Sequence, residues 1–198
     1  IDTDVPPPGA TEQVKPIEGI VEPGEYLQEP VVGQKVEATG SFVAEDFIVI
    51  SSRFNDGEPG YWVSGQFRMA DTEEPTSLAV ALGWTQTREE ADAAVAKLQA
   101  AVKAEPEASF TLTGRIISDE GATLPGRGAG AFDVPRMSPA ALLSFWHDTE
   151  NLNVYRPYMT SATVPFEGTG LTDIISPPPA EPESVNWLNV FYAIEWAV

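Results

Sequence analysis

The sequence has no cysteine and only one histidine, His147, among its 198 residues. The absence of cysteine excludes disulfide frameworks, thiolate nucleophiles, cysteine-ligated zinc and iron–sulfur clusters. A single histidine also excludes any zinc site in this chain that needs two imidazole ligands, such as the H-E-x-x-H helix. The sequence therefore predicts no metal site.

Basic side chains are scarce as well. The chain has 11 lysines and arginines against 30 aspartates and glutamates, which gives a formal charge of −19 at pH 7. A surface of this sign repels phosphate backbones and anionic lipid headgroups, and the chain has no basic stripe. We therefore expect no nucleic-acid partner. Such a charge is typical of a solvated acidic surface, and it would also attract a cationic partner.

The chain also lacks long hydrophobic runs. No stretch of 18 apolar residues occurs, so the sequence holds no complete transmembrane helix. Hydrophobic residues still make up 42% of the chain, which is enough for a folded core. The 16 glycines and 18 prolines exceed the usual share of turn-forming residues and predict a β-rich chain with many loops.

Changes in composition divide the chain into three regions. Residues 1–33 are rich in proline, which predicts an extended tail or linker. Residues 34–176 predict an α+β domain that has a twisted antiparallel β-sheet or small open barrel and two short helices. Residues 177–198 start with three prolines and then become apolar and aromatic. This pattern predicts a stalk and the start of a C-terminal transmembrane helix.

Apolar and β-branched residues mark the predicted strands of the domain. These strands are expected at residues 36–43, 46–51, 61–69, 77–84, 110–117 and 157–164. The run 77–84 is almost entirely apolar and predicts a central strand that is buried on both faces. Gly40 and Gly114 occupy the same point in two similar strands, which predicts matched bulges or barrel bends.

Two predicted helices have recognisable starts. Thr87 is expected to cap the first helix with Glu90 as its capping-box partner, and this helix should end before Pro106. Ser138, followed by a proline, predicts a second helix that extends to about His147. In that position the histidine is expected to interact with the helix dipole and the terminal carbonyl groups.

No sequence motif of the chain clearly indicates a catalytic site. The glycine cluster at 126–130 lacks the preceding strand and following helix of a nucleotide site, so it predicts a loop. With 30 acidic residues, pairs such as Glu73–Glu74 and Glu89–Glu90 are expected without any catalytic role. We therefore predict no catalytic residue. An enzyme that uses acidic side chains or His147 stays open as one hypothesis.

Trp187, Tyr192 and Trp196 lie around an apolar run near the C-terminus. Tryptophan and tyrosine are enriched where a helix passes from water into lipid. We expect these three side chains to lie at a membrane interface. A terminal helix docked on the domain is the alternative.

The order of these elements resembles the Surfeit-locus-one (Shy-type) family of cytochrome c oxidase assembly factors, from about Lys35 to the C-terminus. Residues 53–63 are similar to the family's R-x(3)-G-x(2)-G-x(2)-V stretch, and residues 78–84 are similar to its V-L-V-N-R-G-W strand. Residues 192–196 resemble the Y-A-I-Q-W that starts its second transmembrane helix. The positions that carry this resemblance are Gly40, Arg53, Gly57, Gly60, Gly83, Trp84, Gly114, Tyr192 and Trp196.

This resemblance implies a location in the cell membrane, with the domain on the extracytoplasmic (periplasmic) side between two membrane-anchoring segments. It implies a non-enzymatic role as an accessory or assembly factor of a haem–copper cytochrome c oxidase. The implied partners are the membrane, the oxidase subunits and the cytochrome bcc complex, because similar actinobacterial proteins are associated with a bcc–oxidase supercomplex. Arg53, Gly57, Gly60, Gly83 and Trp84 are expected to be mainly fold determinants.

The sequence departs from the family pattern at two places. The family usually carries a histidine that is linked with haem handling, and this chain has Asn189 there. An amide is a poor haem ligand, so we expect no cofactor. The chain also has Ala81 and Leu82 where the family strand usually has Asn-Arg.

A second hypothesis is a secreted or anchored ligand-binding β-domain with Tyr61, Trp62 and Trp84 on one exposed face. The two hypotheses differ in their membrane anchors. Apolar spans of about 20 residues on both sides of the domain would favour the oxidase factor. One anchor or none would favour the binding domain.

Overall fold

The computed structural model of the chain describes residues 7–122 and 134–179. Its strands are β1 (Lys15–Pro16), β2 (Lys35–Phe42), β3 (Ile48–Asn55), β4 (Glu58–Met69), β5 (Thr76–Thr85), β6 (Phe110–Ile117) and β7 (Asn153–Ser161). Its α-helices are α1 (Arg88–Ala104) and α2 (Pro139–Leu142). Its 3₁₀ helices are η1 (Ala10–Glu12), η2 (Ile17–Gly19), η3 (Glu29–Val31), η4 (Ala44–Asp46) and η5 (Leu143–Phe145).

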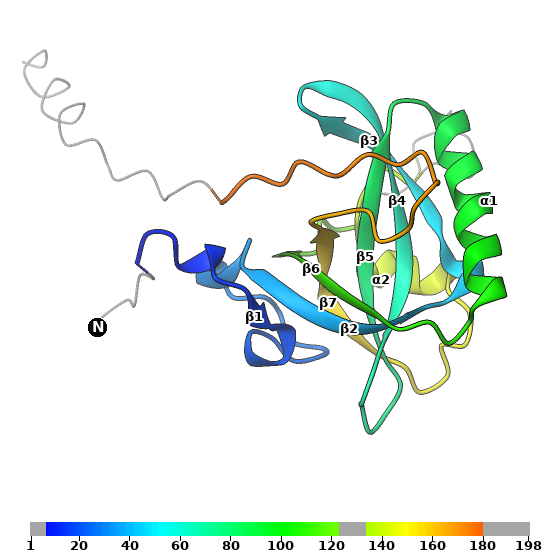
Figure 1. The fold of residues 1–198 in the computed structure, drawn as a ribbon. Helices are drawn as coiled ribbons and strands as arrows, with labels where there is room; N and C mark the ends of the chain where they lie inside the picture. The colour runs from blue at the N-terminus through cyan, green and yellow to red at the C-terminus, as the bar shows by residue number, and fades with distance from the viewer. Residues whose placement is uncertain (1–6, 123–133, 180–198) are drawn as a thin grey trace, which may run out of the picture.

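Five strands close into a barrel in the order β2–β6–β7–β5–β4, because β4 pairs back onto β2 (Figure 1). The remaining strands lie outside this ring, with β1 paired to β2 and β3 paired to β4. The α+β class and a barrel with two helices are therefore confirmed, but the barrel is closed and not open as predicted, and α1 with its 17 residues is not short. The sheet is mixed and not wholly antiparallel as expected, since β5 and β7 pair in parallel, as do β1 and β2. A parallel pair needs a long crossover connection, and α1, β6 and α2 lie between β5 and β7 in the chain.

Two glycines permit the strands to bend around the barrel. A Cβ atom on Gly40 would lie 2.1 Å from the carbonyl oxygen of Arg68, and one on Gly114 would lie 2.0 Å from that of Thr160. At Gly40 the partner of β2 changes from β6 to β4, and near Gly114 the partner of β6 changes from β2 to β7. Any side chain there would collide with the backbone of the neighbouring strand. The pairing registers show no bulge at either glycine, so of the two predicted features the close contacts favour the barrel bend.

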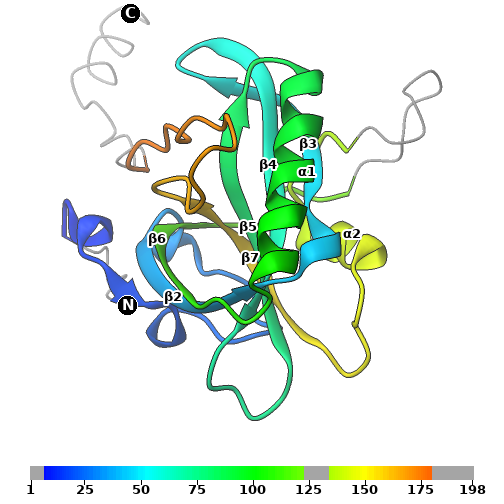
Figure 2. The same cartoon turned by 45° about the vertical axis from the view of Figure 1, so that its right-hand side comes forward.

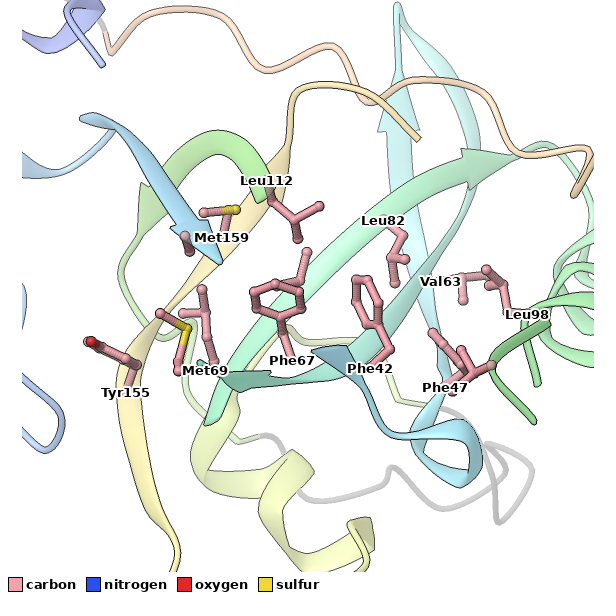
Figure 3. Close-up of a cluster of buried hydrophobic side chains, with 14 of the residues drawn as sticks. Phe42, Phe47, Val63, Phe67, Met69, Leu82, Leu98, Leu112, Tyr155 and Met159 are labelled. Carbon is pink, nitrogen blue, oxygen red and sulfur yellow. The ribbon is translucent and has the colours of Figure 1, made fainter. Parts of the chain in front are cut away.

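Strand β5 is buried from Thr76 to Gly83, which confirms the predicted central strand. Its alternate residues face two separate hydrophobic cores. The first core fills the barrel and extends to the apolar face of α1, as Figure 3 shows. Its larger members include Phe42, Phe47, Val63, Phe67, Met69, Leu82, Leu98, Leu112, Tyr155 and Met159. The second core lies on the outer face of β4, β5 and β7, beneath α2, and contains Ile50, Trp62, Ala79, Ala81, Met137, Leu142, Trp146, Tyr158 and Ile174.

The first helix has the predicted start and end. The side-chain oxygen of Thr87 accepts a hydrogen bond of 3.2 Å from the backbone N–H of Glu90, and α1 ends at Ala104, before Pro106. The second helix is shorter than predicted. It ends at Leu142 and tightens into η5, after which Trp146 takes an extended conformation. Burial of this indole in the second core accounts for the early end, because a continued helix would direct the chain elsewhere.

Several predicted boundaries also shift. The strand expected at 46–51 begins at residue 48 because residues 44–46 form η4, and the last strand covers 153–161 and not 157–164. None of the helices in residues 7–122 and 134–179 is long and apolar enough to cross a membrane. The glycine cluster at 126–130 and the apolar C-terminal segment lie outside the described residues, as do Trp187, Asn189, Tyr192 and Trp196.

The described part of the N-terminal region, residues 7–33, lies against the barrel on the side away from α1 (Figure 1). It contains three 3₁₀ helices, and β1 adds to the edge of β2 in parallel. Ile17 is fully buried and Val21 nearly so, and both belong to the first core. These two side chains attach the proline-rich segment to the domain by burial of apolar surface.

Candidate functional site

Five of the motif positions meet around the β3–β4 hairpin. The hairpin turn is formed by Asp56 and Gly57, whose φ angles of 51° and 79° define a type I′ turn. Arg53 of β3 lies opposite Gly60 of β4 in the pairing register. The indole N–H of Trp84 on β5 donates a 2.9 Å hydrogen bond to the backbone carbonyl of Arg53. The motif therefore joins three neighbouring strands.

At Gly60 and Gly83 neighbouring parts of the chain lie so close to the backbone that a side chain would not fit. A Cβ atom on Gly60 would lie 2.5 Å from the Trp84 ring and 2.2 Å from the carbonyl oxygen of Thr85. One on Gly83 would lie 2.9 Å from Leu171, in the segment that forms an antiparallel bridge to Trp84. The glycines thus leave room for the indole on one side and for the segment after β7 on the other.

The side chain of Arg53 forms an ion pair with Glu120, just after β6. Its Nη1 donates a 2.9 Å hydrogen bond to Oε2 of Glu120, and its Nη2 donates to Oε1. The guanidinium carbon lies 4.4 Å from the ring centroid of Trp62, which is a cation–π contact. Only 12% of the arginine side chain is exposed, so both the charge and the planar group are largely removed from water.

Glu120 is the centre of this cluster. It also accepts hydrogen bonds from the backbone N–H of Met137, at 2.7 Å, and from the hydroxyl of Tyr158, at 3.0 Å. Burial would raise the pKa of Glu120, but the hydrogen bonds from Arg53, Met137 and Tyr158 outweigh it and hold the pKa below its ordinary value. Burial, with the nearby carboxylate, also raises the pKa of the Tyr158 phenol. The ionised carboxylate of Glu120 accepts hydrogen bonds at both oxygens and so connects β3, β7 and the segment before α2.

A second cluster surrounds the buried carboxylate of Asp46, at the end of η4. Its Oδ1 lies 2.5 Å from Nδ1 of His147, and its Oδ2 accepts from the backbone N–H of His147, at 3.0 Å, and from Nε2 of Gln66, at 2.6 Å. The hydrogen bond to Asp46 and its charge raise the pKa of His147, whose ring is 62% exposed. The prediction that His147 contacts a helix dipole is therefore wrong, because α2 ends five residues earlier.

A third cluster joins the two ends of the described chain. The guanidinium of Arg115 on β6 donates to both carboxylate oxygens of Glu12 at 2.9 Å, to the carbonyl of Gly33 at 3.0 Å and to that of Ser176 at 3.0 Å. Hydrogen bonds from Arg115 and then Lys35 lower the pKa of Glu12 to about 2. A single buried side chain thus fixes the segments that precede β2 and follow β7.

The sequence did not identify Glu120, Tyr158, Asp46 or Arg115 as site residues. One signal was available for the arginine. It lies within an apolar strand of a chain that has few basic residues, and a buried charge needs a partner. The remaining partners come from distant parts of the chain, and no local pattern marks them.

The aromatic face expected for a ligand-binding domain is not formed. Tyr61 packs against the first core and Trp62, only 8% exposed, belongs to the second, because neighbouring residues of β4 point to opposite faces. Trp84 packs beside Gly60 at the edge of the second core. In residues 7–122 and 134–179, no group of three or more acidic or histidine side chains could hold a metal ion.

These clusters and the closed sheet define a small α+β barrel domain in which the motif residues connect strands and loops. The SURF1 family model matches residues 8–198, and the chain belongs to this family of cytochrome oxidase assembly factors. Proteins of the family are non-catalytic and membrane-associated. The predicted family and the predicted absence of enzymatic activity are confirmed at this level. No curated protein matches the chain.

Proposed function

We propose that this chain is a non-enzymatic accessory or assembly factor of a haem–copper cytochrome c oxidase. Its domain works on the extracytoplasmic side of the cell membrane and contacts oxidase subunits within a bacterial respiratory supercomplex that includes the cytochrome bcc complex. The observation that carries the proposal is the family match over residues 8–198. The work is done by surface complementarity and by helix packing in the bilayer, and no cofactor takes part.

The Arg115 cluster supports the proposed attachment to one membrane. A domain tethered at both ends to the same bilayer needs both flanking segments to leave from one side. Arg115 holds Glu12 and Ser176 together, and a Cβ atom on Gly33 would lie 3.0 Å from Pro179. In Figures 1 and 2 the N-terminal segment and the end of the segment near residue 179 lie to the left of the barrel, whereas the earlier part of that segment passes close to α1. Trp187, Tyr192 and Trp196 would then set the depth of the C-terminal segment in the membrane.

Purification of the tagged protein in mild detergent from oxidase-expressing cells tests the proposal. Co-purified subunits are identified by mass spectrometry, and the haem spectrum of the eluate is recorded. Oxidase subunits in equal amounts support a resident accessory role, whereas a small fraction of oxidase supports an assembly factor. If no oxidase subunit is enriched over an unrelated tagged membrane protein, the proposed function is wrong.

The absence of cysteine permits a direct test of the orientation. Glu89→Cys introduces a single thiol at an exposed position near the start of α1. In intact cells a membrane-impermeant maleimide should label this variant, and the unsubstituted protein provides the background. Labelling that requires membrane permeabilisation would contradict an extracytoplasmic domain.

A further inference from the structure

A groove of about 520 Å³ lies beside the β4–β5 connection, at the end of β4 opposite the β3–β4 hairpin. One wall is the segment around η2, and the other is the connection between β4 and β5. The beginning of β7 forms its floor. The residues that define these three parts are Glu18, Glu22, Glu73, Glu74, Asn153 and Tyr155.

The groove is strongly acidic. Four glutamates from two separate segments line it, all four are exposed, and no basic residue is among its lining. One of them is positioned by a neighbour, since Oε2 of Glu74 accepts a 2.8 Å hydrogen bond from the side-chain amide of Asn153. Close carboxylates that lack a counter-charge produce a local negative potential, which attracts a cationic group.

The buried side chain of Tyr155 is a second feature of the groove, independent of its charge. It is only 3% exposed and lines the groove, and its hydroxyl makes no hydrogen bond to any residue of the described ranges. Figure 3 shows that the ring packs beside Met69 and that the hydroxyl points away from the other core side chains. Burial raises the pKa of Tyr155 to about 12, and the charges of Glu18 and Glu22 add to this effect. The phenol therefore stays neutral and holds an unused acceptor at the base of an acidic groove.

We propose that this groove binds a lysine or arginine side chain that a protein partner presents. An ammonium or guanidinium group has N–H donors for the carboxylates and for the Tyr155 oxygen together, which satisfies the unpartnered hydroxyl. A metal ion fits less well, because the described residues form no group of three acidic ligands around one point. This binding site is independent of the proposed function, because the evidence for it is the charge and geometry of the groove and does not involve an oxidase.

Fluorescence anisotropy with a labelled peptide that contains four lysines tests this site, at low salt and with the 198-residue chain. The variant E18Q/E22Q removes two charges from the groove, and E89Q/E107Q removes two exposed charges elsewhere and serves as the matched control. We expect E18Q/E22Q to weaken binding by about tenfold and the control to weaken it by less than about twofold. Equal weakening by the two variants would show that only the overall charge acts, and would overturn the site.

Tyr155→Phe tests the role of the hydroxyl without a change of charge. Because this hydroxyl has no partner among the described residues, we expect a Tm within about 2 °C of the unsubstituted protein and peptide binding about threefold weaker. Unchanged binding would overturn the site as described. These assays use purified protein and a peptide, so their failure is distinct from failure to recover an oxidase.

Discussion

Glu120→Gln is the sharpest test of the Arg53 cluster. The carboxylate accepts two hydrogen bonds from Arg53, one from Met137 and one from Tyr158. Glutamine keeps the shape of the side chain. Its amide nitrogen is a donor and would face another N–H or O–H donor. Because glutamine is uncharged, the guanidinium of Arg53 also loses its counter-ion. Each charge-assisted hydrogen bond contributes about 1.5–3 kcal/mol, and removal of one member of a buried ion pair costs about 3–5 kcal/mol. Because this pair is partly exposed, we expect a loss of about 3 kcal/mol and a Tm lower by about 6–12 °C.

Urea unfolding followed by tryptophan fluorescence measures this loss. A double-mutant cycle with Arg53→Met should give a coupling energy of about 2 kcal/mol, because either change alone already breaks the pair. Glu107→Gln at an exposed site is the control and should change stability by less than about 0.5 kcal/mol. A loss below about 1 kcal/mol for Glu120→Gln, or additive effects in the cycle, would refute the cluster as a stabilising element.

The same variant has a defined pH dependence. The pKa of Glu120 is lowered in the folded state, so the stability that its charge contributes is complete above the ordinary value of 4.5 and is lost as the pH falls through the folded-state value. The difference in stability between the unsubstituted protein and Glu120→Gln should therefore shrink as the pH decreases below 4.5. A difference that stays constant or grows in acid would contradict the ionised pair.

Three further predictions concern the other clusters and the barrel. Gly114→Ala should destabilise the domain by more than about 2 kcal/mol or prevent folding, whereas Gly19→Ala, which meets no atom within 4 Å, should change stability little in the same urea assay. The raised pKa of His147 means that its stabilisation is complete below about pH 6.5 and is lost at higher pH, so the advantage over His147→Ala should decline as the pH rises. Arg115→Met should return the pKa of Glu12, followed by NMR titration, from about 2 toward 4.5. An unchanged pKa would exclude the arginine as its main cause.

Local chemistry made several elements predictable. The cap at Thr87 depends on residues within one helical turn, and the burial of β5 follows from an apolar run within one strand. The barrel bends at Gly40 and Gly114 were predictable because only glycine leaves space for two backbones to touch. The cap and the burial of β5 depend on residues that are neighbours in the sequence, whereas at Gly40 and Gly114 the residue type alone gave the signal and the contacting strands are distant.

Non-local contacts account for what the sequence did not reveal. Glu120 is separated from Arg53 by 67 positions, and His147 is separated from Asp46 by 101 positions. The parallel pairing of β5 with β7 likewise depends on where a long connection returns to the sheet. The α2 boundary was wrong because burial of Trp146 in the second core overrides local helix preference.

Closure of the barrel has a consequence for the way the chain matures. In the folded domain β2 pairs with both β4 and β6, and β5 pairs with both β4 and β7, yet β6 and β7 come after α1 in the sequence. A nascent chain that ends before Phe110 therefore leaves open the edges of β2 and β5 that later pair with β6 and β7, and its apolar interior is uncovered. Such edges pair readily with other chains, and contacts between distant residues form slowly. We therefore expect truncation before β7 to favour aggregation over folding, because only β7 closes the ring between β5 and β6.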